Sequence, residues 1–272
     1  MKLSQNKIYE IAMQQSAYDC CCHMEDFTKD YNVVVYSQKN ENARSYIELP
    51  LPCHLVSYGN NIVASCRRDL EGLVRKYIYK YDVEHCFETP NMHVLNDALQ
   101  KHGLRICFMA EYFLPDVEAL YEHSCGYELR LLGQKDFADL YTDSWSNALC
   151  EKRKELDVLG VGAYDGEMLV GLAACSADCV NRSQPDNLSN DTMWQIGVDV
   201  LPSYRRQGIA SALTSRLALE ILERERVPFY CAAWSNIKSV RNAVRSGFHP
   251  AWVEMTAKPV EFVEEMNGKY CL

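Results

Sequence analysis

The sequence predicts an α/β protein, and three features of its second half lead to this class. Apolar residues alternate up to Val200, a period of two that is typical of a half-buried strand. A helix should begin after Gly208, because apolar residues recur there at i, i+4 spacing. These core-facing residues are Ile209, Leu213, Leu217 and Ile221. Asp165-Gly166 stands between two apolar runs, which indicates a hairpin turn. Strands that alternate with helices are typical of the α/β class.

The second half of the chain, residues 126–272, is expected to form one domain in which strands and helices follow a regular order. The expected elements are a strand at 127–132, helices at 134–141 and 145–155, strands at 158–164 and 168–176, a polar loop at 177–191, a strand ending at Val200, a helix from Gly208, a strand at 227–234, a helix at 235–246 and a strand at 251–256. Ser235 is a good N-cap residue for the later helix, and Gly247 is typical of the position after a helix end.

The first half, residues 1–125, predicts a smaller α/β domain of unknown role. The expected elements are a hairpin at 54–65, a helix at 70–81, a helix at 91–102, a strand at 104–114 and a short helix up to His123. This half shows no phosphate-binding loop and no catalytic signature. Two alternatives stay open for it, a degenerate second copy of the fold of residues 126–272 or an unrelated recognition module.

Charge is distributed unevenly along the chain. The 272 residues include 28 Lys and Arg against 37 Asp and Glu, a formal net charge of -9. Residues 202–246 alone hold eight basic and three acidic side chains, a balance of +5, so the remainder carries -14. A short basic segment suits a small anionic cofactor better than nucleic acid, whose phosphate track needs a long basic face. The acidic remainder favours a cationic acceptor such as an amine, although solubility accounts for it equally well.

The absence of a recognisable targeting signal and the pattern of cysteines predict a cytoplasmic protein that does not interact with membranes. The polar N-terminal residues contain no apolar signal segment, and no apolar run approaches the roughly 18 residues of a membrane span. The 13 cysteines are odd in number and irregular in spacing, so a disulfide framework is not expected. Residues 20–23, Cys-Cys-Cys-His, are adjacent, and consecutive side chains on a helix point about 100° apart, so they do not readily share one tetrahedral ion. We therefore expect no metal site.

Residues 198–210 join a strand to a helix through a short loop and are the most informative segment of the chain. Backbone N–H groups gather at such a helix N-terminus, where the helix dipole adds positive charge, so the segment predicts a phosphate site. Gly208 has no Cβ to block the approach of a ligand, and Ala210 is small. No Gly-Lys-Ser/Thr follows, and a single glycine does not make a dinucleotide-binding turn. The segment therefore predicts a site for a phosphorylated cofactor that uses neither the Gly-Lys-Ser/Thr loop nor the dinucleotide-binding turn.

A further reading comes from the spacing within this loop. Arg205-x-x-Gly208-x-Ala210 resembles the Arg/Gln-x-x-Gly-x-Gly/Ala signature of the Gcn5-related N-acetyltransferase (GNAT) family. Asn236-x-x-Ser239 and Gly247-Phe248 resemble a second block of the same family. The resemblance covers roughly residues 126–258. It implies the mixed α/β sheet of GNAT-like acyl-CoA N-acyltransferases for this half, with acetyl-CoA as co-substrate.

The resemblance also implies roles for individual residues. In the family the cofactor strand splays from its neighbour, which frees backbone groups for the pantetheine arm and the thioester oxygen. The residues that would supply those groups here are Val198, Asp199 and Val200, those that would hold the pyrophosphate are Arg205, Arg206, Gln207, Gly208, Ile209 and Ala210, and Asn236 would contact the far arm of the cofactor. A solvated surface charge at Arg206 and a helix-start residue at Asn236 are the alternatives.

The expected catalytic groups depart from the family pattern. Many relatives carry a glutamate at the start of the cofactor strand as general base, whereas residues 192–198 contain no carboxylate. Asp199 is the candidate base, because a carboxylate partly removed from water accepts a proton more readily; a solvent-facing strand residue is the alternative. Ala243 stands where many relatives carry a tyrosine as general acid. A thiol with a pKa of about 8.5 leaves readily as thiolate, so a missing acid is tolerable, and Tyr204 or Tyr230 is a substitute.

These features predict an acetyl-CoA-dependent N-acetyltransferase in which an amine of a small molecule or peptide attacks the thioester directly. The alternative is a catalytically weakened acyl-CoA-binding sensor or interaction module, which the missing glutamate and tyrosine favour. The expected partner is the amine acceptor, and a homodimer is an open alternative to a monomer.

Overall fold

The structure, a computed structural model, describes residues 3–177 and 192–268 of the chain. The chain forms two compact units, and each unit combines two separate stretches of sequence. The first unit comprises residues 1–12 and 112–250, and the second comprises residues 13–111 and 251–272. The predicted polar loop at 177–191 lies, apart from its first residue, outside the described residues.

In each unit, a stretch near one end of the chain contacts a segment that is distant in sequence. In the first unit the side-chain amide of Gln5, on α1 (Gln5–Cys20), donates to the Pro115 carbonyl and accepts from the Val117 N–H, both at 3.1 Å. In the second unit β10 (Phe248–Pro259) pairs antiparallel with β2 (Cys53–Ser57). The sequence suggested continuous halves instead, because pairings between such distant segments leave no local pattern.

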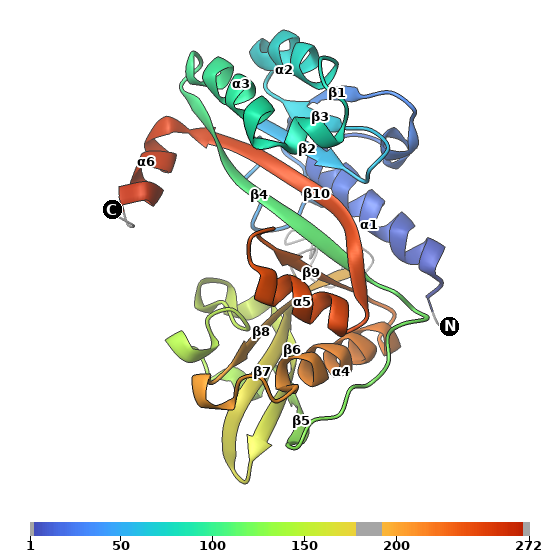
Figure 1. Ribbon diagram of the computed structural model, residues 1–272, viewed down its shortest axis with the longest axis vertical. Helices are drawn as coiled ribbons and strands as arrows, with labels where there is room; N and C mark the ends of the chain where they lie inside the picture. Colours follow the sequence, from blue (N-terminus) through green and yellow to red (C-terminus); the bar gives the residue numbers. More distant parts are fainter. Residues whose placement is uncertain (1–2, 178–191, 269–272) are drawn as a thin grey trace. The chain divides into compact units, whose positions relative to one another are not determined.

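The first unit contains a mixed sheet in the strand order β9–β8–β7–β6–β5 (Figure 1). Its strands are β5 (Glu128–Gly133), β6 (Asp157–Asp165), β7 (Met168–Ser176), β8 (Met193–Val200) and β9 (Val227–Ala232). Neighbours from β5 to β8 pair antiparallel, whereas β8 and β9 pair in parallel, which confirms the predicted mixed sheet. The predicted hairpin is confirmed too, since Asp165 pairs with Met168 across the turn at Gly166.

Helix α4 (Ile209–Glu223) covers one face of this sheet and contacts β6, β7 and β8. Its predicted apolar stripe is the buried side, and each of the four side chains is at most 1% exposed: Ile209, Leu213, Leu217 and Ile221. Burying a side chain of this size contributes about 1.5–3 kcal/mol, so the stripe fixes α4 against the sheet. Helix α5 (Ile237–Arg245) follows β9, and its N-cap is Asn236 rather than the predicted Ser235.

The opposite face of the sheet is covered by residues 134–156, where the sequence predicted two helices. This stretch forms short 3₁₀ turns, at Gln134–Phe137, Asp143–Trp145 and Glu151–Leu156. The Asp157 carboxylate contributes to the difference, because it accepts the Cys150 N–H, which the predicted helix at 145–155 would use internally. Asp199 accepts from the N–H groups of Asn147 and Ala148. The stretch still buries apolar side chains against β5 and β7.

The second unit holds a sheet in the order β1–β3–β2–β10. Its further elements are β1 (Val33–Tyr36), β3 (Val63–Cys66), α2 (Glu71–Ile78), α3 (Thr89–Gln100), α6 (Val260–Gly268) and β4 (Leu104–Pro115), whose last residues belong to the first unit. The predicted hairpin, the two longer helices and the strand of residues 1–125 are confirmed. Strand β1 and helix α6 were not predicted, and turns replace the short helix expected before His123. No helix in the described part of the chain is long and apolar enough to cross a membrane.

Gly197 on β8 lets the 134–156 stretch lie close to the sheet. A Cβ on Gly197 would stand 1.8 Å from the main-chain oxygen of Asn147, a contact that requires a backbone shift. We predict that Gly197→Ala lowers the free energy of unfolding by about 1–3 kcal/mol through overpacking, measured by urea denaturation. The matched control is Gly72→Ala on α2, where an added Cβ meets nothing within 4 Å. It should leave stability unchanged or raise it by up to about 1 kcal/mol, and equal effects of the two substitutions would contradict the close approach.

Candidate functional site

The sheet of the first unit opens between β8 and β9. Their parallel ladder runs from Met193 to Gln195 of β8, although both strands continue for several residues beyond it. On its other side β8 stays paired with β7 as far as Val200. Alternate residues of a strand direct their main-chain groups to opposite sides, and the Leu201 N–H donates to the Val170 carbonyl of β7, so Asp199 also faces β7. Beyond Gln195, Val198 and the Val200 N–H therefore face the β9 side, where a ligand can take the place of a strand, whereas the Val200 carbonyl accepts from Nε of Arg205 at 3.0 Å. This confirms the splayed strand that the resemblance implied.

Helix α4 begins directly after the loop that follows β8, with an open N-terminus. Its N-cap is Gly208, whose φ of +82° lies in the left-handed region and whose position gives no side-chain cap. The first helical hydrogen bond is donated by Ala212 to the Gly208 carbonyl at 3.1 Å, so the N–H groups of Ile209, Ala210 and Ser211 precede it. A Cβ on Gly208 would meet nothing within 4 Å. The helix start is thus a group of N–H donors with free space in front of it.

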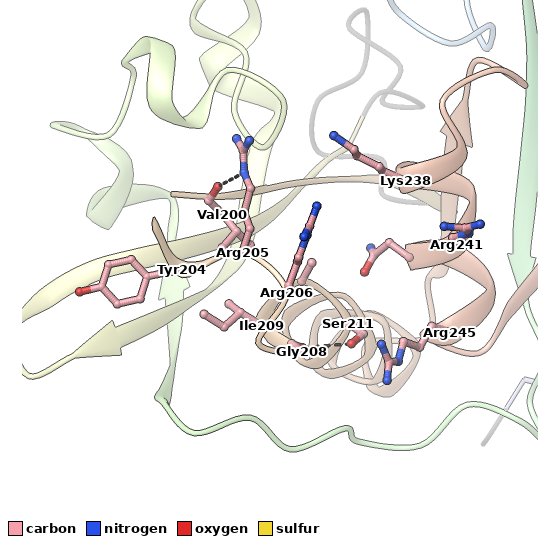
Figure 2. A pocket seen from close by; sticks show the side chains of 12 residues that line it. Val200, Tyr204, Arg205, Arg206, Gly208, Ile209, Ser211, Lys238, Arg241 and Arg245 are labelled. Carbon is pink, nitrogen blue, oxygen red and sulfur yellow. Dashed lines mark hydrogen bonds between the residues drawn. The ribbon is translucent and has the colours of Figure 1, made fainter. Parts of the chain in front are cut away.

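A pocket of about 220 Å³ lies at this helix start, within the first unit (Figure 2). The loop and α4 contribute Tyr204, Arg205, Arg206, Gly208, Ile209, Ala210 and Ser211 to its lining, next to Val200 of β8. Helix α5 contributes Lys238, Arg241, Asn242 and Arg245. Five of these side chains are cationic and none is acidic. Figure 2 shows the cationic side chains projecting from two elements, the loop and α5. Their combined field makes the pocket a site for an anion.

Two tyrosines hold the loop before α4 in place. The Tyr127 hydroxyl donates to Oε1 of Gln207 at 2.7 Å, and the Tyr204 hydroxyl donates to Oδ2 of Asp165 at 3.0 Å. The rings of Tyr127 and Tyr204 meet edge to face with centroids 5.7 Å apart. The hairpin between β6 and β7 and the segment before β5 therefore support the loop from outside the pocket.

Some of the residues that were predicted to bind the cofactor line the pocket, and others lie outside its lining. Those that line the pocket are Val200, Arg205, Arg206, Gly208, Ile209 and Ala210. The side chain of Val198 packs against the core beneath α4, Gln207 binds Tyr127, and Asn236 caps α5 by accepting from the Ser239 N–H. The lining residues that sequence reasoning missed are Tyr204, Ser211, Lys238, Arg241, Asn242 and Arg245. Three of these are cations at i, i+3 and i+7 on α5, a spacing that marks a single helix face.

Asp199 lies on the face of β8 opposite to Val198 and Val200, toward the 134–156 stretch. Its carboxylate accepts three hydrogen bonds, from the Asn147 N–H at 2.8 Å, the Asn147 side-chain amide at 2.7 Å and the Ala148 N–H at 3.0 Å. The side chain therefore holds this stretch against β8. Its role as general base stays a prediction, and it requires one carboxylate oxygen to exchange such a bond for a substrate proton.

The candidates for a general acid have partners of their own. The hydrogen bond to Asp165 raises the pKa of Tyr204. Burial raises the pKa of Tyr230, whose hydroxyl shares a hydrogen bond of 2.7 Å with Oγ of Ser239. Ala243 is fully buried in the core. Among the described residues, no group of three His, Cys, Asp or Glu side chains is arranged to hold a metal ion.

The mixed sheet, the opened strand and the cationic helix start define an α/β domain suited to a phosphorylated ligand. Comparison with protein families narrows this class, because residues 117–248 match the model of the Acetyltransferase (GNAT) family. This part of the chain, which lies within the first unit, is a GNAT-family acetyltransferase domain, as its motifs predicted. No curated protein matches the chain.

Solved structures similar to the chain include two described acetyltransferases and one acetyltransferase-like protein. A GCN5-related N-acetyltransferase-like protein from Streptococcus suis is 17% identical with a TM-score of 0.43, over 62% of this chain and 69% of that one. An acetyltransferase of the GNAT family from Colwellia psychrerythraea is 15% identical with a TM-score of 0.42, over 60% and 61%. A GCN5-related N-acetyltransferase from Sphaerobacter thermophilus is 14% identical with a TM-score of 0.43, over 73% and 72%. The chain spans less than two thirds of the length of the Colwellia protein.

Proposed function

We propose that the protein uses acetyl-CoA as co-substrate and acetylates an amine of a small molecule or peptide. The family match assigns residues 117–248 to acetyltransferases in general. The choice of cofactor rests mainly on the cationic pocket at the start of α4. This pocket lies beside the part of β8 that is not paired with β9. The acidic balance outside residues 202–246 supports a positively charged amine as acceptor.

The described residues fit the diphosphate of coenzyme A. A Cβ on Gly208 would meet no atom within 4 Å, and the pocket at the helix start leaves room for a phosphate. The first-turn N–H groups of α4 donate to phosphate oxygens in such a position. Arg205 and Arg206 come from the same loop and line the same pocket, so they add charge-assisted bonds.

The opened strand supports the transfer step. When bound, acetyl-CoA supplies an activated thioester and a thiol whose pKa of about 8.5 allows it to leave as thiolate. In the proposal the main chain of Val198 and Val200 holds this arm in one orientation, whereas the main chain of Asp199, which was predicted to take part, pairs with β7. The N–H groups of Val198 and Val200 offer hydrogen bonds to the carbonyl oxygen as negative charge develops there.

The acceptor must lose a proton before its nitrogen can attack, and Asp199 remains the proposed base. The stretch around Asn147 lies on the same face of β8, because Asp199 accepts from it. We propose that this stretch forms one wall of the acceptor site. Because Asp199 both holds the Asn147 stretch and acts as the proposed base, an acceptor that binds against this stretch would lie close to the group that removes its proton.

A second candidate function is an acyl-CoA-binding sensor or interaction module with weakened catalysis. Two observations favour it. The carboxylate of Asp199 is engaged by three donors, and Ala243 is buried at the position where the family resemblance implies a tyrosine. Cofactor binding alone would then be the function of the pocket.

Thiol release from acetyl-CoA, followed with a chromogenic thiol reagent across a panel of amines and peptides, separates the two candidates. The transferase predicts release that depends on at least one acceptor and exceeds hydrolysis without it. Coenzyme A binding measured by calorimetry on the same sample provides the control. Binding without acceptor-dependent release from any amine would support the sensor and contradict the transferase.

Gly208→Val should reduce the affinity for coenzyme A by more than about tenfold, because the new side chain fills the space in front of the helix start. The control is Gly103→Val in the second unit, since Gly103 also has a positive φ, +71° against +82°, and equally open space. Both substitutions strain the backbone, but the control should retain wild-type affinity in isothermal titration calorimetry. An unchanged affinity of Gly208→Val for coenzyme A would contradict the binding of the diphosphate at this helix start.

Asp199→Asn should lower kcat by about 100-fold or more while leaving the coenzyme A dissociation constant within about twofold, because the amide cannot accept the proton. Asn147→Ala distinguishes a base from a structural acceptor, because it removes one donor to Asp199 and leaves the carboxylate in place. This variant should keep kcat within about threefold of the wild type. Equal losses of kcat in the two variants would make Asp199 a support for the Asn147 stretch only.

A further inference from the structure

Helix α5 presents a cationic face to the pocket. Lys238, Arg241 and Arg245 project within an arc of about 60° around the helix axis, and all three line the pocket. The opposite side of the helix is buried, as Ala243 shows with no exposed surface. The orientation of α5 is therefore fixed by its core packing, and the cationic face is held toward the pocket (Figure 2).

The cations of this face differ from other arginines of the same unit. On α4, Arg216 and Arg224 both bind the carboxylate of Glu220, at 2.6 Å and 2.8 Å. Within the described part of the chain, Lys238, Arg241 and Arg245 form no such ion pair, and no acidic side chain lines their pocket. Like charges on one helix face repel each other, and an anion in the pocket would offset this repulsion.

The diphosphate alone does not account for five cations. The two linked phosphates of coenzyme A bring about two negative charges, and the loop supplies Arg205 and Arg206 together with the helix start for them. The cationic face of α5 adds three more positive charges to the same pocket. Coenzyme A also carries a phosphomonoester on the 3′-oxygen of its ribose, which adds about 1.5–2 negative charges at neutral pH.

We propose that the cationic face of α5 binds the 3′-phosphate and makes the protein selective for coenzyme A over 3′-dephospho-coenzyme A. This inference rests on the proposed function. Arg241 and Arg245 offer planar guanidinium groups that match phosphate oxygens, and Lys238 adds a point charge. The three side chains thus set which form of the cofactor is bound, separately from the loop that holds the diphosphate.

Calorimetric titration of the full chain with both ligands tests the proposal. Wild type should bind coenzyme A about 10–100-fold more tightly than 3′-dephospho-coenzyme A, the range expected for charge-assisted hydrogen bonds. In Arg241→Gln/Arg245→Gln this ratio should fall to within about threefold of unity through weaker binding of coenzyme A only. Arg206→Gln, by contrast, should weaken both ligands equally, because its proposed contact is the diphosphate that they share.

Arg216→Gln/Arg224→Gln is the matched control, since it removes two positive charges from the same unit at positions that do not line the pocket. Its selectivity ratio should equal that of the wild type. Equal affinities of wild type for the two ligands would overturn the role of α5 and leave the proposed function intact. A ratio unchanged in Arg241→Gln/Arg245→Gln would likewise overturn it. Failure of both ligands to bind wild type would instead reject the proposed function itself.

Discussion

The positive start of α4 is the interaction on which the rest of the site depends. The first-turn N–H groups have no acceptor within the helix, and the helix dipole adds about half a unit of positive charge at this end. Gly208 leaves the helix start open, and no acidic residue stands in the first turn. Five cationic side chains around one pocket add to this field. A diphosphate matches the donors of the helix start and the charge of Arg205 and Arg206, and this match supports the proposed cofactor.

The surrounding packing keeps this helix start rigid. The buried stripe of α4 fixes the helix on the sheet, and the bond from Tyr127 to Gln207 fixes the loop before it. On the far face of β8, Asp199 holds the Asn147 stretch, for which Gly197 leaves room. A site whose donors are held in place before binding loses less freedom when the ligand arrives. In the proposal β8 therefore serves both substrates, the cofactor along its β9 edge and the acceptor on the face of Asp199.

Local patterns predicted much of this arrangement. The helix after Gly208, the turn at Gly166 and the splayed strand all depend on residues close in sequence or on a short motif, and each is confirmed. The 134–156 stretch was predicted wrongly in part because the Cys150 N–H binds the Asp157 carboxylate instead of a helix carbonyl, a contact that the apolar pattern does not reveal. The cationic face of α5 was overlooked for a related reason. Its spacing is visible in the sequence, but the side of the helix that faces the pocket is decided by core packing.

A crystal structure of the protein with coenzyme A would test the diphosphate site most directly. We predict phosphate oxygens about 2.7–3.2 Å from the main-chain nitrogens at the start of α4, with the pantetheine arm running along β8 beyond Gln195. Coenzyme A bound with its diphosphate away from Gly208, or a helix start that stays empty at saturating ligand, would contradict the assignment of this site.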